Sequence, residues 1–554
     1  MLGPFLFCAT IDHSSMPDEK TGPSTPGISA ATGAAWRALE KNVPLSQSII
    51  WSLQRDFYER RGLKAWNEDL VPSYITNNPF IAEIYAAIVA AFLRDCMSPA
   101  HHNSTPLSRE NPLLILELGA GTGKFSYLFL RKLTALLQGN NIPSQLVRYC
   151  MTDTAENLIT EWRENAYLKE FADSGVLEFK VFQAGQDHPV QTAGPLVVIA
   201  NYVFDSLPQD AFSIENGAIH EILVTTLAAV DAEIQSLKDL QFSYQNSAIA
   251  SRRYTDDLWN SILEQYRTHF SAATILFPAS ALQTLQQLSD SSDGRMLLLV
   301  ADKGIAHEED LALAPGAPSL DFHAGGKCFS QLVNFDAIGK YFRGNGGEAL
   351  APPKHFTSLN VCAFIQRNPG DEFPATHKAY QETVDAFGPD DLFALMSWLN
   401  AYLEEIPLPQ VLPLLRLTRW DPVVLSRLFP VIARQARNAK AERSDLRDAV
   451  LNTWENHYPL NKDENVLAFY CGVILLELRF FQEAYSMFRN SQQLYGPSAT
   501  TSYNLGLCCL GLGRSREALE LMREACNLDP SFEPARHSRF KLEDQVRTGE
   551  LELS

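Results

Sequence analysis

The sequence lacks an excess of basic residues. Its 554 residues include 46 Lys and Arg against 65 Asp and Glu, which gives a net charge of −19. Proteins that bind nucleic acids or anionic membrane surfaces need clustered positive charge. We therefore expect no nucleic-acid partner and no membrane partner. The chain also has no run of roughly 18 apolar residues, the length that a membrane-spanning helix needs.

Cysteine patterns of metal or redox sites are also missing. The nine cysteines form no C-x-x-C pair, so we interpret them as buried free thiols in a reducing compartment and predict no metal site. The first basic residue is Lys20 and the first arginine is Arg37. We therefore expect neither a secretory signal nor an Arg-rich mitochondrial presequence, and we predict a cytoplasmic protein.

Changes in residue pattern divide the chain into four parts. Residues 1–34, largely rich in Ser, Thr, Pro and Gly, predict a mobile leader. Residues 35–367 predict one large domain, with a helical N-terminal part at 35–97 and an α/β core at 111–367. Only helical patterning follows, first at 379–460 and then at 465–546.

The α/β core is predicted from alternating strand and helix patterns. The apolar run LLILEL at 113–118 is typical of a buried parallel strand, and an amphipathic stretch follows it from Lys124. Such alternation predicts a doubly wound, Rossmann-like sheet with right-handed crossovers. Further strands are expected at 147–153, 176–183, 195–204, 219–226, 295–302 and 359–366.

A glycine-rich turn joins the first strand to its helix, in the order Glu117-Leu-Gly119-Ala-Gly121-Thr-Gly123. Glycines allow the tight turn and the close approach of a ligand. The dinucleotide fingerprint is G-x-G-x-x-G, and Lys124 stands where its third glycine belongs. The spacing instead resembles motif I of class I methyltransferases that use S-adenosylmethionine (SAM). A nicotinamide enzyme of the same fold is the alternative.

Two later strand ends supply candidate cofactor ligands. Asp153 ends the next strand, where a carboxylate can accept hydrogen bonds from both ribose hydroxyls. The alternative for Asp153 is an N-cap of the following helix. After the third strand, Gln186 or Asp187 is placed to bond the adenine amino group, and a plain surface turn is the alternative there.

The segment after the fourth strand carries the expected acceptor site. Ligands of doubly wound sheets bind beyond the carboxyl ends of the strands, which is where Asn201, Tyr202 and Asp205 fall. The segment NYVFDSLP resembles the A-N-E-F-F-D-A-L-P signature of the MidA-like family, which includes mitochondrial complex I assembly methyltransferases. The resemblance spans residues 48–366 and includes Asp302-Lys-Gly304 and His323.

This resemblance implies a SAM-dependent methyltransferase. Asn201 and Asp205 would shape the acceptor site, with Asp205 orienting or deprotonating the nucleophile. His323 is either a second candidate base or an ordinary loop histidine. Tyr202 replaces the family's Glu, and a Tyr cannot hold a guanidinium as a carboxylate does. The acceptor, a protein side chain or a small molecule, therefore stays open, and a catalytically inactive scaffold is the alternative function.

The C-terminal part contains an internal repeat with an offset of 34 residues. Gly472 corresponds to Gly506, and Ala484 corresponds to Ala518. This period and these small residues are typical of tetratricopeptide repeats, which bind peptides or proteins. We expect the repeats, with a capping helix up to 546, to recruit a protein partner. A purely supporting or self-associating role is the alternative.

Overall fold

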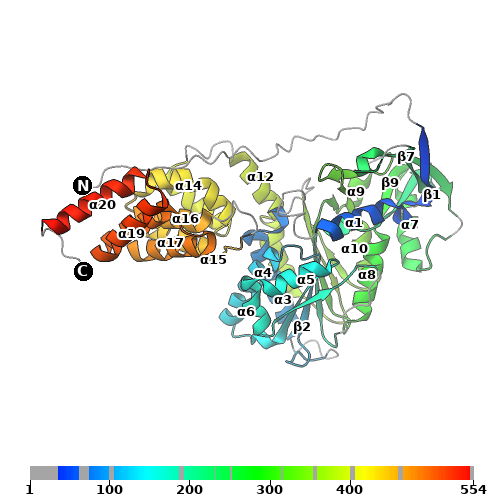
Figure 1. Cartoon of the computed structure of the whole chain (residues 1–554). Helices are drawn as coiled ribbons and strands as arrows, with labels where there is room; N and C mark the ends of the chain where they lie inside the picture. The colour runs from blue at the N-terminus through cyan, green and yellow to red at the C-terminus, as the bar shows by residue number, and fades with distance from the viewer. Residues whose placement is uncertain are drawn as a thin grey trace. The chain divides into compact units, whose positions relative to one another are not determined.

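The structure is a computed structural model that describes residues 35–61, 74–98, 105–185, 192–230, 233–249, 252–312, 316–353, 359–399, 406–459 and 466–548. These residues form two compact units, one of residues 37–467 and one from Ala468 onward. Figure 1 shows the elements of both units. No helix among these ranges is long and apolar enough to cross a membrane.

A seven-stranded sheet forms the centre of the first unit, in the order β15-β16-β10-β5-β2-β3-β4. Strands β10, β5, β2, β3 and β4 are parallel, whereas β16 runs antiparallel to both of its neighbours. The predicted doubly wound α/β fold is thus confirmed. The strands are β2 (Leu113–Leu118), β3 (Val147–Asp153), β4 (Leu177–Val181), β5 (Leu196–Asn201), β10 (Met296–Asp302), β15 (Glu348–Leu350) and β16 (Asn360–Gln366).

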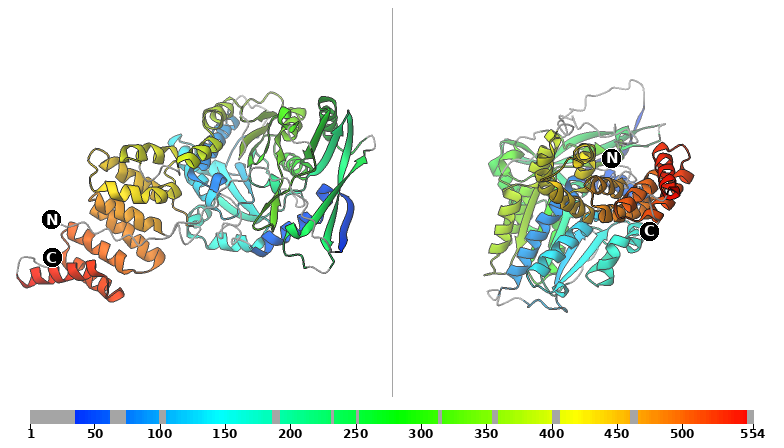
Figure 2. Two further views of the ribbon diagram at one scale, coloured as in Figure 1. Left: turned by 90° about the horizontal axis from the view of Figure 1, so that it is seen from above. Right: turned by 90° about the vertical axis from the view of Figure 1, so that its left-hand side faces the viewer.

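Helices cover both faces of this sheet (Figures 1 and 2). Because strand side chains alternate between faces, Leu114, Leu116 and Leu118 face one helical layer, and Glu117 turns toward the other. The first layer contains α7 (Asp257–His269), α8 (Ala279–Asp290) and α10 (Phe335–Gly344). The second contains α3 (Pro79–Cys96), α4 (Lys124–Gly139) and α11 (Pro374–Tyr380), which ends in one π-helical turn, Gln381–Asp385.

Local sequence explains where several helices begin. Asn78 caps α3 by accepting hydrogen bonds from the backbone N–H groups of Phe80 and Ile81, with Pro79 at the first helical position. The pattern after Asp153 forms two helices rather than one, α5 (Glu156–Glu164) and α6 (Ala166–Asp173). Asn165 separates them, because its side chain caps α6.

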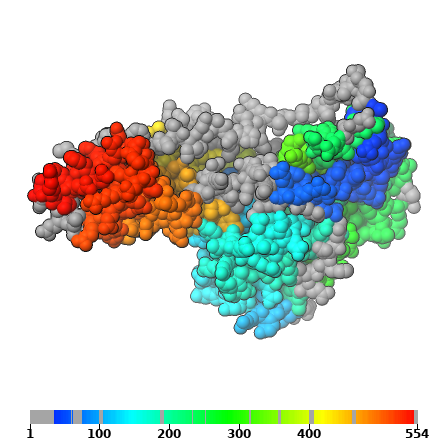
Figure 3. Space-filling view, in the orientation of Figure 1, coloured from blue at the N-terminus to red at the C-terminus, as the bar shows by residue number. Residues whose placement is uncertain are grey.

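A second, antiparallel sheet lies in the same unit and corrects the prediction for the N-terminal part. Residues 36–44, expected to be helical, form an edge strand beside β7, and the strand predicted at 219–226 lies in this sheet as well. The pairing of these residues with β7 overrides their helix propensity. One contact between the two strands is the 2.6 Å hydrogen bond that Glu40 accepts from Thr226. Figure 3 shows the blue N-terminal segment beside the green strands. The strands are β1 (Trp36–Pro44), β6 (Asp210–Glu215), β7 (Ala218–Ala229), β8 (Leu240–Ala248) and β9 (Ala272–Phe277).

Shorter elements complete the α/β region. Strand pairs form between β11 and β14 and between β12 and β13. Their bounds, with those of the remaining short helices, are β11 (Gly304–Ile305), β12 (Asp321–His323), β13 (Cys328–Ser330), β14 (Val333–Asn334), α1 (Ile50–Arg61), α9 (Glu308–Leu311) and the 3₁₀ turns Leu45–Gln47, Tyr74–Thr76, Ser144–Leu146, Phe204–Ser206 and Leu237–Asp239.

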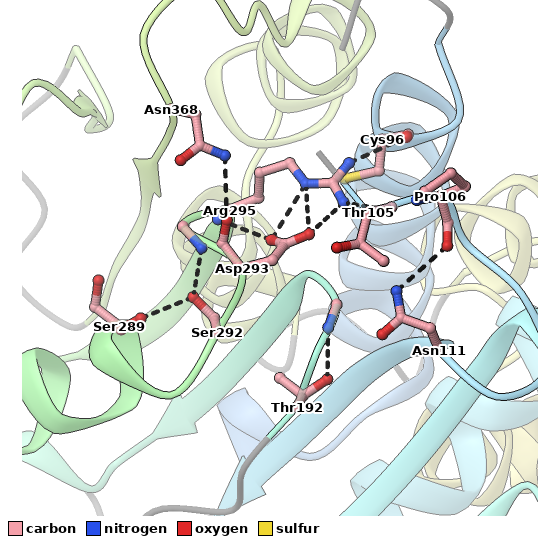
Figure 4. A network of polar contacts seen from close by, with 12 residues as sticks. Cys96, Thr105, Pro106, Asn111, Thr192, Ser289, Ser292, Asp293, Arg295 and Asn368 are labelled. Carbon is pink, nitrogen blue, oxygen red and sulfur yellow. Dashed lines mark hydrogen bonds and ion pairs between the residues drawn. The ribbon is translucent and has the colours of Figure 1, made fainter. Parts of the chain in front are cut away.

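A buried ion pair fixes the start of β10, at the amino end of the sheet. Arg295 is 1% exposed and pairs with Asp293. Its guanidinium also donates to the carbonyls of Cys96 at 3.2 Å and Thr105 at 3.0 Å (Figure 4). A buried charge needs such a full set of partners. This network lies at the opposite end of β10 from Asp302, and so leaves the carboxyl ends of the strands for function.

The described part of the C-terminal region is built of helices. Those of the first unit are α12 (Pro389–Leu399), α13 (Leu408–Leu417), α14 (Pro422–Ala436) and α15 (Arg443–Glu455). They belong to the same compact unit as the α/β sheet, whereas the sequence pattern had set 379–460 apart. The rest are α16 (Leu467–Glu477), α17 (Phe481–Tyr495), α18 (Ala499–Gly511), α19 (Ser515–Leu528) and α20 (Glu533–Arg547).

The two halves of the internal repeat pack alike. A methyl group added at Gly472 would lie 2.7 Å from the Phe488 ring, and one added at Gly506 would lie 2.7 Å from Met522. Both contact pairs differ by the same 34 positions in sequence. The small residue of one helix thus admits a large side chain of the next. Whether these hairpins are tetratricopeptide repeats stays a prediction.

Candidate functional site

The glycine-rich turn lies between β2 and α4, as predicted. Gly119, Gly121 and Gly123 have φ angles of 63°, 53° and 77°, which side-chain-bearing residues rarely adopt. A methyl group at Gly119 would also lie 3.0 Å from Val203. Backbone angles and space therefore both explain the glycines.

Two buried aromatic side chains hold the carbonyl groups of this turn. The Trp162 indole donates to the Gly121 carbonyl oxygen at 2.9 Å, and the Tyr458 hydroxyl donates to that of Thr122 at 2.9 Å. Sequence reasoning missed both residues, because neither lies in a motif. Tyr458 follows α15, more than 300 positions along the chain from the turn it contacts.

Asp153 ends β3 beside the turn. Its carboxylate accepts hydrogen bonds from the N–H of Gly121 at 3.1 Å and of Thr154 at 2.7 Å. Burial raises its pKa, although these backbone donors oppose the shift. The N-cap of α5 is Ala155, which makes no side-chain capping bond. The structure therefore does not support the helix-cap alternative for Asp153.

Glu117 faces α4 from the end of β2. It is 5% exposed and accepts hydrogen bonds from the hydroxyls of Ser126 and, at 2.7 Å, Tyr149. Burial raises the pKa of Glu117 to about 7, although both hydroxyl groups lower it. The carboxyl group is therefore poised to change protonation near neutral pH.

A cavity of about 310 Å³ opens at the carboxyl ends of the parallel strands. It brings together five of the predicted site residues: Glu117, Gly119, Gly121, Asp153 and Asn201. Gly123 supports the turn but does not line the cavity. Gln186 and Asp187 lie outside the described residues, and the preceding segment lines the cavity through Phe182, Gln183, Ala184 and Gly185.

Asn201 and Tyr202 form the cavity wall at the end of β5. The Asn201 side-chain oxygen accepts a 2.8 Å hydrogen bond from Tyr85, whereas its buried amide nitrogen has no hydrogen-bond partner among the described residues. Tyr202 has a φ of 52°, a strained angle for a non-glycine residue. An unsatisfied donor and local strain are both typical of a ligand site.

Asp205 and Asp302 form a buried carboxyl pair behind this wall. Burial raises the pKa of Asp302 well above its ordinary value, and the Asp205 charge raises it further. Burial raises the pKa of Asp205 to about 6. Asp302 accepts a 3.1 Å hydrogen bond from the Phe204 N–H, which fixes the 202–205 segment. Asp205 does not line the cavity, and its carboxylate accepts from Ser206 at 2.9 Å.

His323 ends β12 and also lies outside the cavity lining. Its Nε2 atom is 2.9 Å from the Ser330 hydroxyl and 3.8 Å from an Asp321 carboxylate oxygen. The Asp321 charge in turn raises the pKa of Asp205. Asp321 thus links His323 to the Asp205 region.

Helix α1 supplies a wall that the sequence analysis did not identify. Trp51, Gln54, Arg55 and Tyr58 all line the cavity. Their spacing of three, four and seven residues places them on one helix face. Gln54 and Trp51 are fixed by 2.8 Å hydrogen bonds to the backbone of Phe329 and Leu45. The spacing of these four residues on one face of a helix was the signal that could have found them.

The cavity suits a nucleoside cofactor. Its volume falls within the range of roughly 300–1,000 Å³ typical of small-molecule sites. The glycine turn admits a close approach, Asp153 offers carboxylate oxygens, and the Asn201 amide offers unused N–H donors. These groups match a ribose, an adenine and an amino-acid moiety, which are the parts of SAM.

Comparison with known proteins found matches to a family model and to solved structures. Residues 95–311 match a family model described as "Putative S-adenosyl-L-methionine-dependent methyltransferase". An uncharacterized protein from Burkholderia thailandensis is 16% identical, with a TM-score of 0.38 over 60% of this chain and 88% of that one. A second structure from that organism, bound to S-adenosyl-homocysteine, is 15% identical, with a TM-score of 0.39 over 60% and 89%. Curated proteins gave no match.

The matched segment contains the glycine turn, Asp153, Asn201 and Asp205. The resemblance drawn from ELGAGTG and NYVFDSLP is therefore confirmed. Residues 95–311 thus match a family of SAM-dependent methyltransferases, in line with the resemblance to the MidA-like family, and SAM is the cofactor.

Proposed function

We propose that the chain transfers the methyl group of SAM to a nucleophile held between the end of β5 and helix α1. The observation that carries this proposal is the unpartnered amide nitrogen of Asn201, buried in the wall that faces the glycine turn. When bound, SAM supplies a methyl group on a sulfonium. The nucleophile bonds to the methyl carbon as the carbon–sulfur bond breaks, and S-adenosylhomocysteine (SAH) and a proton are released.

The wall of α1 is the proposed acceptor side of the cavity. Trp51 and Tyr58 offer aromatic surface, and Gln54 and Arg55 offer polar groups. Fixed side chains can align an acceptor for in-line attack, which is the main contribution a protein makes to such a transfer. Both a protein side chain and a small molecule are acceptors compatible with this wall.

Asp205 is the proposed positioning residue for turnover. Its buried carboxylate influences the cavity-lining Tyr58, whose pKa it helps to raise after the larger effect of burial. We expect Asp205→Asn to lower methyl transfer while leaving SAH affinity unchanged. Full transfer by this variant would assign Asp205 a structural role and leave His323 as the next candidate.

The C-terminal repeats are proposed to recruit a protein partner or substrate. Support comes from the equivalent packing of Gly472 on Phe488 and Gly506 on Met522, since stacked helical hairpins commonly bind peptides. We also propose a cytoplasmic location, in keeping with the eight described cysteines, which are all free and buried.

A catalytically inactive scaffold is the second candidate. Tyr202 favours it, because this cavity-lining residue replaces the family's carboxylate. The deciding experiment incubates the full chain with methyl-labelled SAM and a native lysate. Label on a protein or small molecule supports the enzyme, and its loss with Asp205→Asn supports the proposed role of Asp205. SAH binding without any labelled product supports the scaffold.

A further inference from the structure

We propose that Tyr458, from the helical region beyond the methyltransferase fold, is a positioning residue of the cofactor site. The inference rests on the proposed binding of SAM at the glycine turn. Residues matched to the family end at Leu311, so Tyr458 lies outside the matched segment.

The contact is direct and buried. The Tyr458 side chain is 2% exposed, and its hydroxyl donates to the Thr122 carbonyl at 2.9 Å. The Tyr458 hydroxyl oxygen also accepts a 2.9 Å hydrogen bond from the Asn165 side-chain amide. With one proton and one acceptor site both used, the hydroxyl is held in a single orientation.

The bond acts on the part of the turn that faces the cavity. Thr122 lines the cavity, and its hydroxyl accepts a 3.3 Å hydrogen bond from Asn77, which lines the cavity as well. The Thr122 carbonyl accepts a hydrogen bond from Tyr458, and the Gly121 carbonyl accepts one from Trp162. These bonds fix two successive peptide planes, and so the backbone groups that approach the cofactor.

Tyr458 is itself held rigidly. The nearby Glu455 pairs with Arg131 at 3.1 Å. Asn456 donates to the carbonyls of Arg419 and Trp420 at 2.8 and 3.0 Å, which ties α15 to the start of α14. The end of α15 is therefore a fixed support for the turn rather than a loose linker.

A second contact joins the same helices to the cavity. Asp421, the N-cap of α14, accepts a 2.9 Å hydrogen bond from Tyr74. Tyr74 begins the short helical turn that ends in Thr76, a cavity-lining residue. Two edges of the cavity thus depend on helices α14 and α15.

The test compares Tyr458→Phe with Tyr167→Phe in the full chain. Both variants remove one hydroxyl from the same aromatic cluster, but Tyr167 bonds His457 rather than the turn. Losing a donor to a buried carbonyl should weaken SAH binding roughly three- to thirtyfold for Tyr458→Phe. Tyr167→Phe should stay within about twofold of wild type. Equal SAH affinity for Tyr458→Phe and wild type would overturn the proposal.

A third variant keeps the ring and the fold. Asn165→Asp retains the side-chain oxygen that caps α6. It replaces the amide nitrogen, which donates to Tyr458, with a carboxylate oxygen, which can only accept. The tyrosine proton should then leave the Thr122 carbonyl, and SAH binding should weaken as with Tyr458→Phe. Unchanged binding by this variant would contradict the proposed orientation.

Hydrogen exchange of the ligand-free chain supplies a readout independent of the cofactor. The Gly123 N–H donates to the Ala120 carbonyl at 2.9 Å. It should exchange faster in Tyr458→Phe than in wild type or Tyr167→Phe, and identical rates in all three would count against the proposal. A wild-type chain that failed to bind SAH would instead refute the proposed function.

Discussion

Asp153 is the residue whose role can be tested most simply. Asp153 lines the cavity at the end of β3, where a carboxylate can accept hydrogen bonds from ribose hydroxyls. Asp153→Ala should weaken SAH binding by roughly ten- to a hundredfold, because a charged hydrogen-bond acceptor is lost. Calorimetry measures this, with the exposed Asp173→Ala as control. Unchanged affinity with a lower melting temperature would show that Asp153 only supports the turn.

Glu117 should couple SAM binding to pH. Its pKa of about 7 leaves much of it protonated at neutral pH. A cationic sulfonium nearby favours the carboxylate, so binding should release up to about half a proton at pH 7. Because the bound state holds fewer protons, SAM affinity should rise between pH 6 and 8.

Calorimetry in buffers with different ionisation enthalpies measures that release. SAH lacks the sulfonium charge and should release less, and Glu117→Gln should abolish the buffer dependence. A binding enthalpy independent of buffer in the wild-type chain would contradict the assignment.

At the scale of elements, the two equivalent glycines of the repeat allow a direct comparison of how tightly the two helix pairs pack. Gly472→Ala pushes a methyl group into the Phe488 ring, whereas Gly506→Ala meets the flexible end of Met522. Overpacking costs about 1–3 kcal/mol, and replacing a helical glycine with alanine gains about 1 kcal/mol. Gly472→Ala should therefore lower the free energy of unfolding, and Gly506→Ala should change it little. Denaturant unfolding of both variants checks this, and the reverse order would be inconsistent with the packing.

The elements also show how far the sequence could be interpreted. LLILEL and ELGAGTG predicted the central strand and its turn, because their periodicity and glycines depend on local geometry. Residues 36–44 were expected to be helical but form a strand, because their state is decided by a partner strand that is distant in sequence, with 186 positions between Glu40 and Thr226. Distance in sequence likewise hid Tyr458, whose role exists only once α15 has folded against the turn.

Asp205 illustrates the same limit within a motif. Its position after β5 was predictable, but its burial away from the cavity lining was not. That placement depends on Asp302, which pulls in the backbone at Phe204 from the neighbouring strand. Gln186 and Asp187 stay predictions, since they lie outside the described residues.

For the whole molecule, the boundary between the two units predicts what can be removed. A chain ending at residue 465 keeps Tyr458 and should bind SAH like the full chain, but should lose partners recruited by the repeats. A chain ending at Arg367 lacks α14 and α15 and should bind SAH weakly. Calorimetry and pull-downs from a native lysate test both. Wild-type affinity of the shorter chain, or unchanged partners of the longer one, would contradict this division.

The most direct test of the central claim is a calorimetric titration of SAH into the full chain and into Gly121→Val. Gly121 has a φ of 53° and lines the cavity, so a branched side chain there should both strain the turn and fill the space for the cofactor. The account predicts one SAH per wild-type chain and no measurable binding by the variant, with the circular dichroism of the variant unchanged. No binding by the wild type, or equal binding by the variant, would contradict it.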